Sequence, residues 1–159
     1  MSEPVVLAHW YQRFDTFSFS TQEFYERLTN EIGRRDMPDV RMARVNLPEG
    51  GLLKGYRDYL RVTRGKHSFT LCAAPFGIDF FVSWWLLEDS GCLGGCLTAI
   101  IPLLAIFARR TTFYEEDTLA VFRDSVHQAV LETIDGIFST SEKKPEFDRK
   151  PITRSRILG

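Results

Sequence analysis

Residues 57–88 read RDYLRVTRGKHSFTLCAAPFGIDFFVSWWLLE, and this stretch decides the fold. It contains three runs rich in β-branched and aromatic residues, at 57–64, 66–74 and 78–88. Such runs favour strands. Gly65 separates the first two runs and the sequence Ala-Pro-Phe-Gly separates the last two, which is typical of tight turns. The stretch therefore predicts three consecutive antiparallel strands, a β-meander.

Two further strands are predicted on the N-terminal side of this stretch. Residues 39–47 (DVRMARVNL) alternate apolar and charged side chains, which is the pattern of a half-buried strand. Residues 4–14 (PVVLAHWYQRF) are again rich in β-branched and aromatic types. We expect both segments to join the meander.

Two amphipathic helices are predicted from their capping signals and apolar stripes. The first follows Ser20 and carries phenylalanine, leucine and isoleucine at helical spacing. The second covers about Phe113–Phe138 and follows a capping box formed by Thr112 and Glu115. Strands followed by helices in this order indicate an α+β fold, an antiparallel meander sheet of about four to five strands with helices packed on one face.

The length and composition predict one domain and a short tail. A chain of 159 residues with 44% hydrophobic and 26% charged residues is typical of a folded domain. We expect a single α+β domain over residues 1–139. The segment 140–159 is polar, contains two prolines and carries more basic than acidic residues, so we expect an extended basic C-terminal tail.

Side-chain alternation predicts which residues of the meander share a face. If both turns have even lengths, we expect one almost wholly apolar face under the helices, made of Leu60, Val62, Phe69, Leu71, Ala73, Phe81 and Trp85. The opposite face, which also carries Tyr59, would then hold a stripe formed by Phe80, Val82, Trp84 and Leu86. Three things could cover this stripe: the uncharged segment that follows it, the N-terminal strand region, or another molecule.

The uncharged segment is residues 90–108, SGCLGGCLTAIIPLLAIFA. We expect an apolar helical segment over 91–108, and nineteen residues would suffice for a membrane span. A span would, however, place the sheet and the last helix on opposite sides of a membrane, although each has an apolar face that fits the other. A membrane-surface or re-entrant element and a core or partner-facing segment therefore remain as alternatives.

The chemistry-bearing residues are scattered. Cys92 and Cys96 are four residues apart and would lie on one side of a helix, but zinc needs about four ligands and no second paired motif exists. No glycine-rich phosphate loop and no local catalytic triad is present, so we expect no cofactor, no metal and no catalytic site. The net charge of −1 argues against nucleic acid as a partner. The N-terminus does not look like a signal peptide, which favours a cytoplasmic protein with reduced thiols.

One enzyme class remains as an alternative. A helix, a four-strand antiparallel meander, a cysteine soon afterwards and then further helices resemble the topology of a ubiquitin-conjugating enzyme. That resemblance implies a cysteine-dependent transferase with Cys92 or Cys96 as the nucleophile. The His-Pro-Asn motif and the tyrosine-proline-rich loop of that family are missing, and the N-terminal strand is additional.

The sequence favours a non-catalytic interaction or assembly module of a multi-protein or membrane-associated complex. We expect a protein partner or self-association, with a membrane surface as a further possibility. The predicted contact residues come from the meander and from the uncharged segment: Tyr59, Phe80, Val82, Trp84, Leu86, Leu97, Ile100, Ile101, Leu104 and Phe107.

Overall fold

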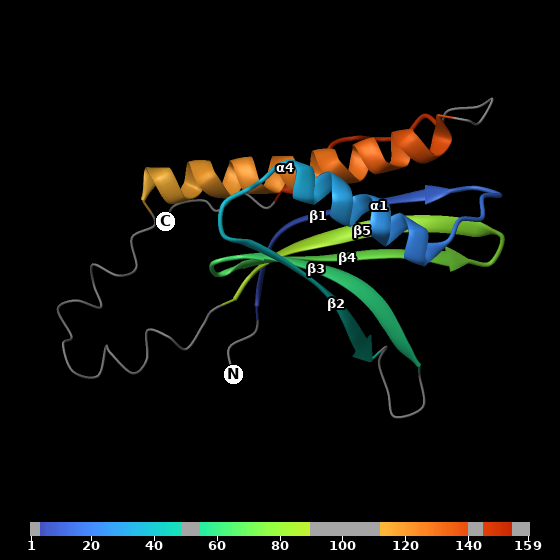
Figure 1. Cartoon of the computed structure of the whole chain (residues 1–159), viewed down its shortest axis with the longest axis horizontal. Coiled ribbons are helices and arrows are strands. Elements are labelled where there is room, and N and C mark those ends of the chain that lie inside the picture. Colours follow the sequence, from blue (N-terminus) through green and yellow to red (C-terminus); the bar gives the residue numbers. More distant parts are fainter. Residues whose placement is uncertain (1–3, 49–54, 90–111, 140–144, 154–159) are drawn as a thin grey trace.

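The computed structural model describes residues 4–48, 55–89, 112–139 and 145–153. Within these residues it forms one six-stranded antiparallel sheet with the strand order β2-β3-β4-β5-β1-β6, and both helices lie on the same face of this sheet (Figure 1). The elements are β1 (Val5–Phe14), α1 (Thr21–Arg34), β2 (Val40–Pro48), β3 (Tyr56–Arg64), β4 (His67–Phe76), β5 (Asp79–Glu88), α4 (Phe113–Phe138) and β6 (Ile152–Thr153). The predicted α+β class and the antiparallel meander are confirmed.

Two-residue turns connect the strands of the meander. Arg64 pairs with His67 around the first turn, and Phe76 pairs with Asp79 around the second. Each turn begins with a glycine at positive φ, +56° in the first and +65° in the second. Glycine adopts this conformation without steric cost, which explains why these glycines can begin such short hairpin turns.

The expected assignment of faces is wrong for β5. Across a two-residue turn, an odd-numbered residue of one strand pairs with an even-numbered residue of the next, and paired residues share a face. The expected grouping instead placed odd-numbered residues of β4 and β5 on one face, which would require a three-residue turn. In the structure Leu71 pairs with Trp84 and Ala73 pairs with Val82. The residues predicted as an uncovered stripe therefore point toward the helices, and each is at most 1% exposed: Phe80, Val82, Trp84 and Leu86.

The core lies between this sheet face and the two helices. Helix α1 contributes Phe24, Leu28 and Ile32, the residues of its predicted stripe, and all are buried. Helix α4 begins at the predicted capping box, in which the Thr112 hydroxyl accepts from Glu115 N at 3.2 Å and the Glu115 carboxylate accepts from Thr112 N at 3.0 Å. Caps of this kind satisfy backbone donors that a helix start leaves unpaired.

The uncharged segment 90–108 and its predicted helix over 91–108 lie outside the described residues. Among the helices that the structure does describe, neither combines the length and apolar character that crossing a membrane would require.

Tyr25 joins α1 to a fork in the sheet. Strands β3 and β4 stay paired as far as Leu60 and Leu71, and beyond this pair the β2–β3 hairpin bends away from the other strands (Figure 1). The Tyr25 hydroxyl lies in the fork, where it donates to the carbonyl oxygen of Asp58 at 2.9 Å and accepts from Ala73 N at 3.0 Å. It therefore replaces backbone pairing that the two strands lose where they separate.

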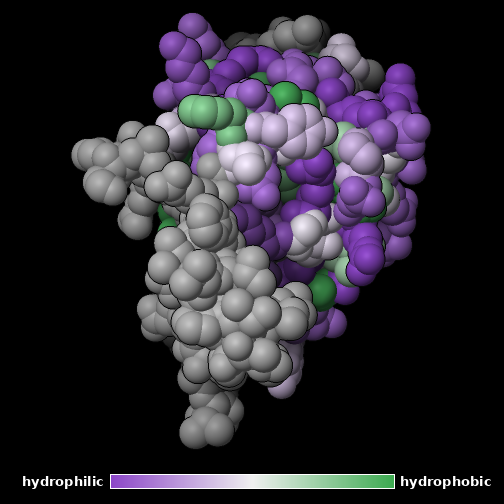
Figure 2. Space-filling model, turned by 90° about the vertical axis from the view of Figure 1, so that its left-hand side faces the viewer, coloured by the Kyte–Doolittle hydropathy of each residue, from purple (hydrophilic) through white to green (hydrophobic). Residues whose placement is uncertain are grey.

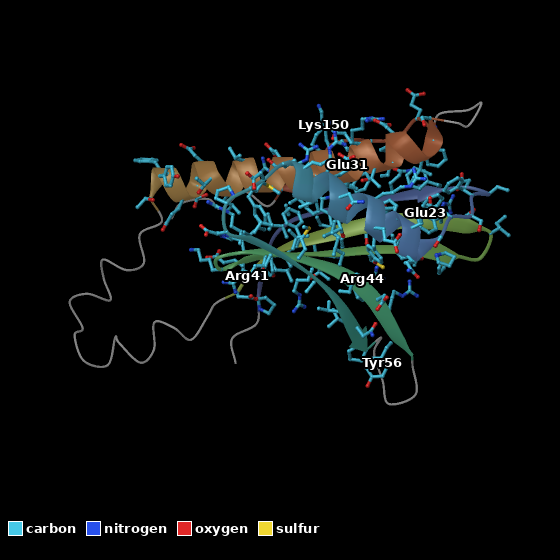
Figure 3. The ribbon with its side chains drawn as sticks, viewed as in Figure 1. Glu23, Glu31, Arg41, Arg44, Tyr56 and Lys150 are labelled. Carbon is cyan, nitrogen blue, oxygen red and sulfur yellow. The ribbon has the colours of Figure 1, made fainter. Side chains whose placement is uncertain are left out.

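The surroundings of Tyr25 keep its hydroxyl neutral. Burial raises the pKa of the Tyr25 phenol above its ordinary value. The guanidinium carbon of Arg44 lies 4.1 Å from the centroid of the tyrosine ring, and the same guanidinium forms a 2.6 Å ion pair with Asp58. Figure 3 shows Arg44 on the β2–β3 hairpin, so this contact also ties the hairpin to α1.

Replacing Tyr25 by phenylalanine removes the hydroxyl and keeps the ring. We expect Tyr25→Phe to lower the free energy of unfolding by about 1–3 kcal/mol, because Asp58 O and Ala73 N lose their partner in a buried place. Urea denaturation followed by circular dichroism measures this change. The matched control is Tyr56→Phe at the exposed end of the hairpin (Figure 3), which should stay within about 0.5 kcal/mol of wild type. Equal stability of the two variants would contradict the role given to Tyr25.

A buried histidine connects the sheet, α4 and the C-terminal segment. The indole Nε1 of Trp84 donates to Nδ1 of His127 at 3.1 Å, and Nε2 of His127 lies 2.6 Å from the carbonyl oxygen of Arg149. Because indole N–H can only donate, Nδ1 must be the acceptor, and Nε2 carries the proton that it donates to Arg149. This pair of bonds requires a neutral imidazole.

Residues 145–153 are held against the domain by several further contacts. The indole of Trp10 donates to the carbonyl oxygen of Asp148 at 2.9 Å, and Arg149 forms two hydrogen bonds with the Asp135 carboxylate, at 2.7 and 3.0 Å. Phe147 packs against the Trp10 ring, and β6 pairs with β1. This part of the predicted extended tail is thus docked between α4 and β1.

The His127 contacts predict a loss of stability in acid. Burial lowers the pKa of His127 and outweighs the opposing effects of the Arg149 carbonyl and the Asp124 carboxylate. The unfolded chain then binds the proton more readily, so the stabilisation is complete above a pH of about 6.5 and is lost as the pH falls below it. We expect the urea midpoint of the wild type to drop between pH 7.5 and 5.5.

The variant His127→Gln isolates this effect, because glutamine cannot titrate but can still accept from Trp84 and donate to Arg149. Burial also lowers the pKa of His9, so the variant should retain some pH dependence from that residue. A wild type and a variant with the same pH dependence would show that His127 is not the group that titrates.

Candidate interaction site

The residues predicted to contact a partner are separated by the structure. Tyr59 lies on the sheet face opposite the helices and is half-buried. The four β5 residues of the predicted stripe are in the core, so they offer no surface to a partner. The remaining predicted contacts lie outside the described residues, as do both candidate nucleophiles: Leu97, Ile100, Ile101, Leu104, Phe107, Cys92 and Cys96.

The opposite side of the sheet, which we call the helix-free face, takes the place of the predicted stripe. No helix in the described ranges lies on it, and in Figure 1 it is the lower side of the sheet. The β4–β5 register places Phe81, Ser83, Trp85 and Leu87 there. Its other members follow from the strand pairing: His9, Tyr11 and Arg13 of β1, Ser68, Thr70, Cys72 and Ala74 of β4, Arg57, Tyr59, Arg61 and Thr63 of β3, and Arg41, Ala43, Val45 and Leu47 of β2.

An aromatic cluster lies on the β1–β5 half of this face. The rings of His9 and Trp85 stack with their centroids 3.7 Å apart, and the rings of His9 and Tyr11 stack at 5.8 Å. Trp85 is 42% exposed and Tyr11 is 64% exposed. Because burial lowers the pKa of His9, its imidazole is neutral at neutral pH and packs as an aromatic ring. The cluster presents a partly apolar surface to solvent.

The centre of the face has only small side chains. On β4 these are serine, threonine, cysteine and alanine, and all four are buried although neither of the described helices covers them. Larger side chains of the flanking strands lean over this floor, since the guanidinium of Arg57 lies 5.9 Å from the ring of Phe81 across Ala74. The β4 strand thus forms a low floor between an aromatic side and an arginine-rich side.

The arginines on this face differ in their partners. Arg13 forms ion pairs with Asp15 at 2.8 Å and with Asp79 at 3.8 Å. Arg41, which Figure 3 shows near the end of the sheet, and Arg61 form no ion pair within the residues that the structure describes. Arg41 and Arg61 therefore carry positive charge that no carboxylate of the described residues pairs with.

Two buried polar atoms at the centre of the face have no partner. Arg61 and Thr70 are directly opposite each other on β3 and β4. Neither the Nε of Arg61 nor the Oγ1 of Thr70 has a hydrogen-bond partner in the described ranges. A buried polar atom without a partner costs about 1–3 kcal/mol. Arg61 Nε and Thr70 Oγ1 can each donate a hydrogen bond, and no acceptor in the described ranges receives one from either atom.

A cavity of about 600 Å³ lies at the end of the sheet, between the β3–β4 turn and the start of α4. This end faces the viewer in Figure 2, and its described surface is mainly hydrophilic. Two of its basic side chains already have partners, because Arg64 Nε donates to the carbonyl oxygen of Pro38 and Lys66 forms a 2.9 Å ion pair with Glu88. The cavity therefore offers a weaker case for a binding site than the helix-free face.

Cys72, His9 and His127 all take part in the packing of the described domain. Cys72 is buried and takes part in no disulfide. His127 forms hydrogen bonds with the Trp84 indole and the Arg149 carbonyl oxygen, and the His9 ring stacks on Trp85. Across the described ranges, no three His, Cys, Asp or Glu side chains are grouped so that they could hold a metal ion. The transferase alternative depends on Cys92 and Cys96 and stays a prediction.

The aromatic cluster and Arg61 were not predicted as site residues. The signal that could have found the aromatic cluster is the length of the second turn, because Gly77 at its first position is typical of a two-residue hairpin turn. That turn length places Phe81 and Trp85 on the helix-free face, and the pairing of β1 with β5 then adds His9 and Tyr11.

Comparison with protein-family models and with curated proteins found no match to this chain.

Proposed function

We propose that this protein is a non-catalytic interaction module that binds a segment of another protein on its helix-free face. The observation that carries the proposal is the exposed pair Trp85 and Tyr11 on the same face as Arg41 and Arg61, which no described carboxylate balances. Tryptophan, tyrosine and arginine are the residue types that most often dominate binding energy at protein interfaces.

The charge of the face favours an acidic and partly apolar partner segment. The aromatic side would contact apolar side chains, and the arginine side would contact carboxylates. A symmetric dimer formed through this face would use the same patch on both copies. The strand residues of this face include arginines but no unpaired aspartate or glutamate, so a second copy could offer its arginines no free carboxylate. Charge complementarity therefore supports a different protein as the partner rather than a second copy of this chain.

Selection from a random peptide library displayed on phage would test this proposal. We expect selected peptides to combine aspartate or glutamate with large apolar residues. Replacing Trp85 by serine should weaken their binding by about 2 kcal/mol, which is about thirtyfold, because it removes a large aromatic contact. Fluorescence anisotropy with labelled peptides would measure this change.

The matched control is Val121→Ser, which removes another exposed apolar side chain, on α4 and away from the helix-free face. This control should bind the peptides as tightly as the wild type, and circular dichroism should show both variants folded. The same anisotropy assay with single-stranded RNA, and co-sedimentation with anionic lipid vesicles, cover two other classes of partner. No enriched peptide, or binding to RNA or vesicles that depends on Trp85 in place of peptide binding, would overturn the proposal.

A further inference from the structure

Arg61 and Thr70 form a polar pair at the centre of the helix-free face. They are cross-strand neighbours, and Thr70 is 9% exposed. Within the described part of the chain, Arg61 Nε and Thr70 Oγ1 accept and donate no hydrogen bond, although almost all buried polar groups in proteins do. A group that is left unsatisfied inside a binding face points to a ligand that supplies the missing bond.

We infer that Arg61 and Thr70 form a carboxylate-binding subsite that takes an acidic side chain of the partner segment. This inference rests on the proposed function and adds the chemical group that the face recognises. The guanidinium Nε and one Nη are parallel donors that match the two oxygens of a carboxylate, and the threonine hydroxyl can add a third hydrogen bond. Both atoms are buried in the free protein, so their side chains must shift to expose them to the carboxylate, and both would then have partners in the complex.

The position of Trp85 adds an apolar requirement to this subsite. Trp85 pairs with Thr70 on the side away from Arg61, so the three residues follow one another across β5, β4 and β3. Neighbouring strands are about 4.8 Å apart, so Arg61 and Trp85 are anchored about 10 Å from each other with only Thr70 between them. This spacing suits a carboxylate bound by Arg61 together with an apolar group that contacts the indole.

Phenylacetate is a suitable probe because it has a carboxylate and a ring and needs no identified partner. Titration into the ¹⁵N-labelled protein, followed by NMR, should produce saturable shifts of the Arg61 Nε–H and Trp85 indole signals. Arg61→Lys keeps the charge but removes the paired donors, and we expect it to weaken binding about tenfold. Inorganic phosphate should bind more weakly than phenylacetate, because it lacks the ring that would contact Trp85.

Thr70→Val gives a second test with two opposite effects. It should weaken phenylacetate binding about tenfold, because the hydroxyl bond to the carboxylate is lost. It should also raise the urea midpoint of the protein without ligand, because it removes a buried hydroxyl that lacks a partner. The matched control is Thr63→Val on the same face, which should leave phenylacetate binding unchanged.

Three results would overturn the subsite: unchanged phenylacetate binding by both variants, a lower urea midpoint for Thr70→Val, or phosphate bound as tightly as phenylacetate. The two proposals fail separately. If selected peptides depend on Trp85 but not on Arg61, the subsite is wrong and the interaction face stands. If phenylacetate binds as expected while peptides ignore Trp85, the interaction face is wrong.

Discussion

The rest of the structure depends on the pairing of β4 with β5 across the two-residue turn at Gly77 and Ile78. This pairing turns Phe80, Val82, Trp84 and Leu86 toward the helices, where they supply the centre of the core. It also turns the alternate residues of β5 outward, beside the aromatic residues of β1. A shift of one residue would exchange these two sets, so the same contact determines both the buried layer and the exposed face.

The Trp84–His127 hydrogen bond shows how a polar contact is used inside this core. Trp84 is fully buried, and its indole N–H would be costly without an acceptor. His127 provides that acceptor and passes a second hydrogen bond to the carbonyl oxygen of Arg149. Hydrogen bonds therefore connect the docked C-terminal segment to Trp84 of β5 through His127. A change in this segment would alter the contacts of that buried tryptophan.

The existence, type and approximate limits of the main elements could be predicted from the sequence, because strand alternation, helical stripes and capping boxes are local signals. Alternation could not choose the buried face of β5, since Phe80, Trp84 and Leu86 on one face are as apolar as Phe81, Trp85 and Leu87 on the other. The two-residue length of the turn at Gly77 and Ile78 determines which face of β5 is buried. Alternation along one strand places Tyr59 and Arg61 on the correct side of the sheet, whereas the aromatic cluster depends on the pairing of β1 with β5, which no single stretch specifies.

The outermost strands of the sheet bear on its solubility. An uncovered strand edge offers a row of backbone donors and acceptors to any other extended chain, and edge-to-edge addition of this kind begins aggregation. The short strand β6 occupies the outer side of β1 at Ala8 and His9, while β2 at the other side carries Arg41 and Arg44 and ends at Pro48. Charged side chains and proline disfavour strand addition. The docked C-terminal segment thus covers a part of the β1 edge that would otherwise be open to strand addition.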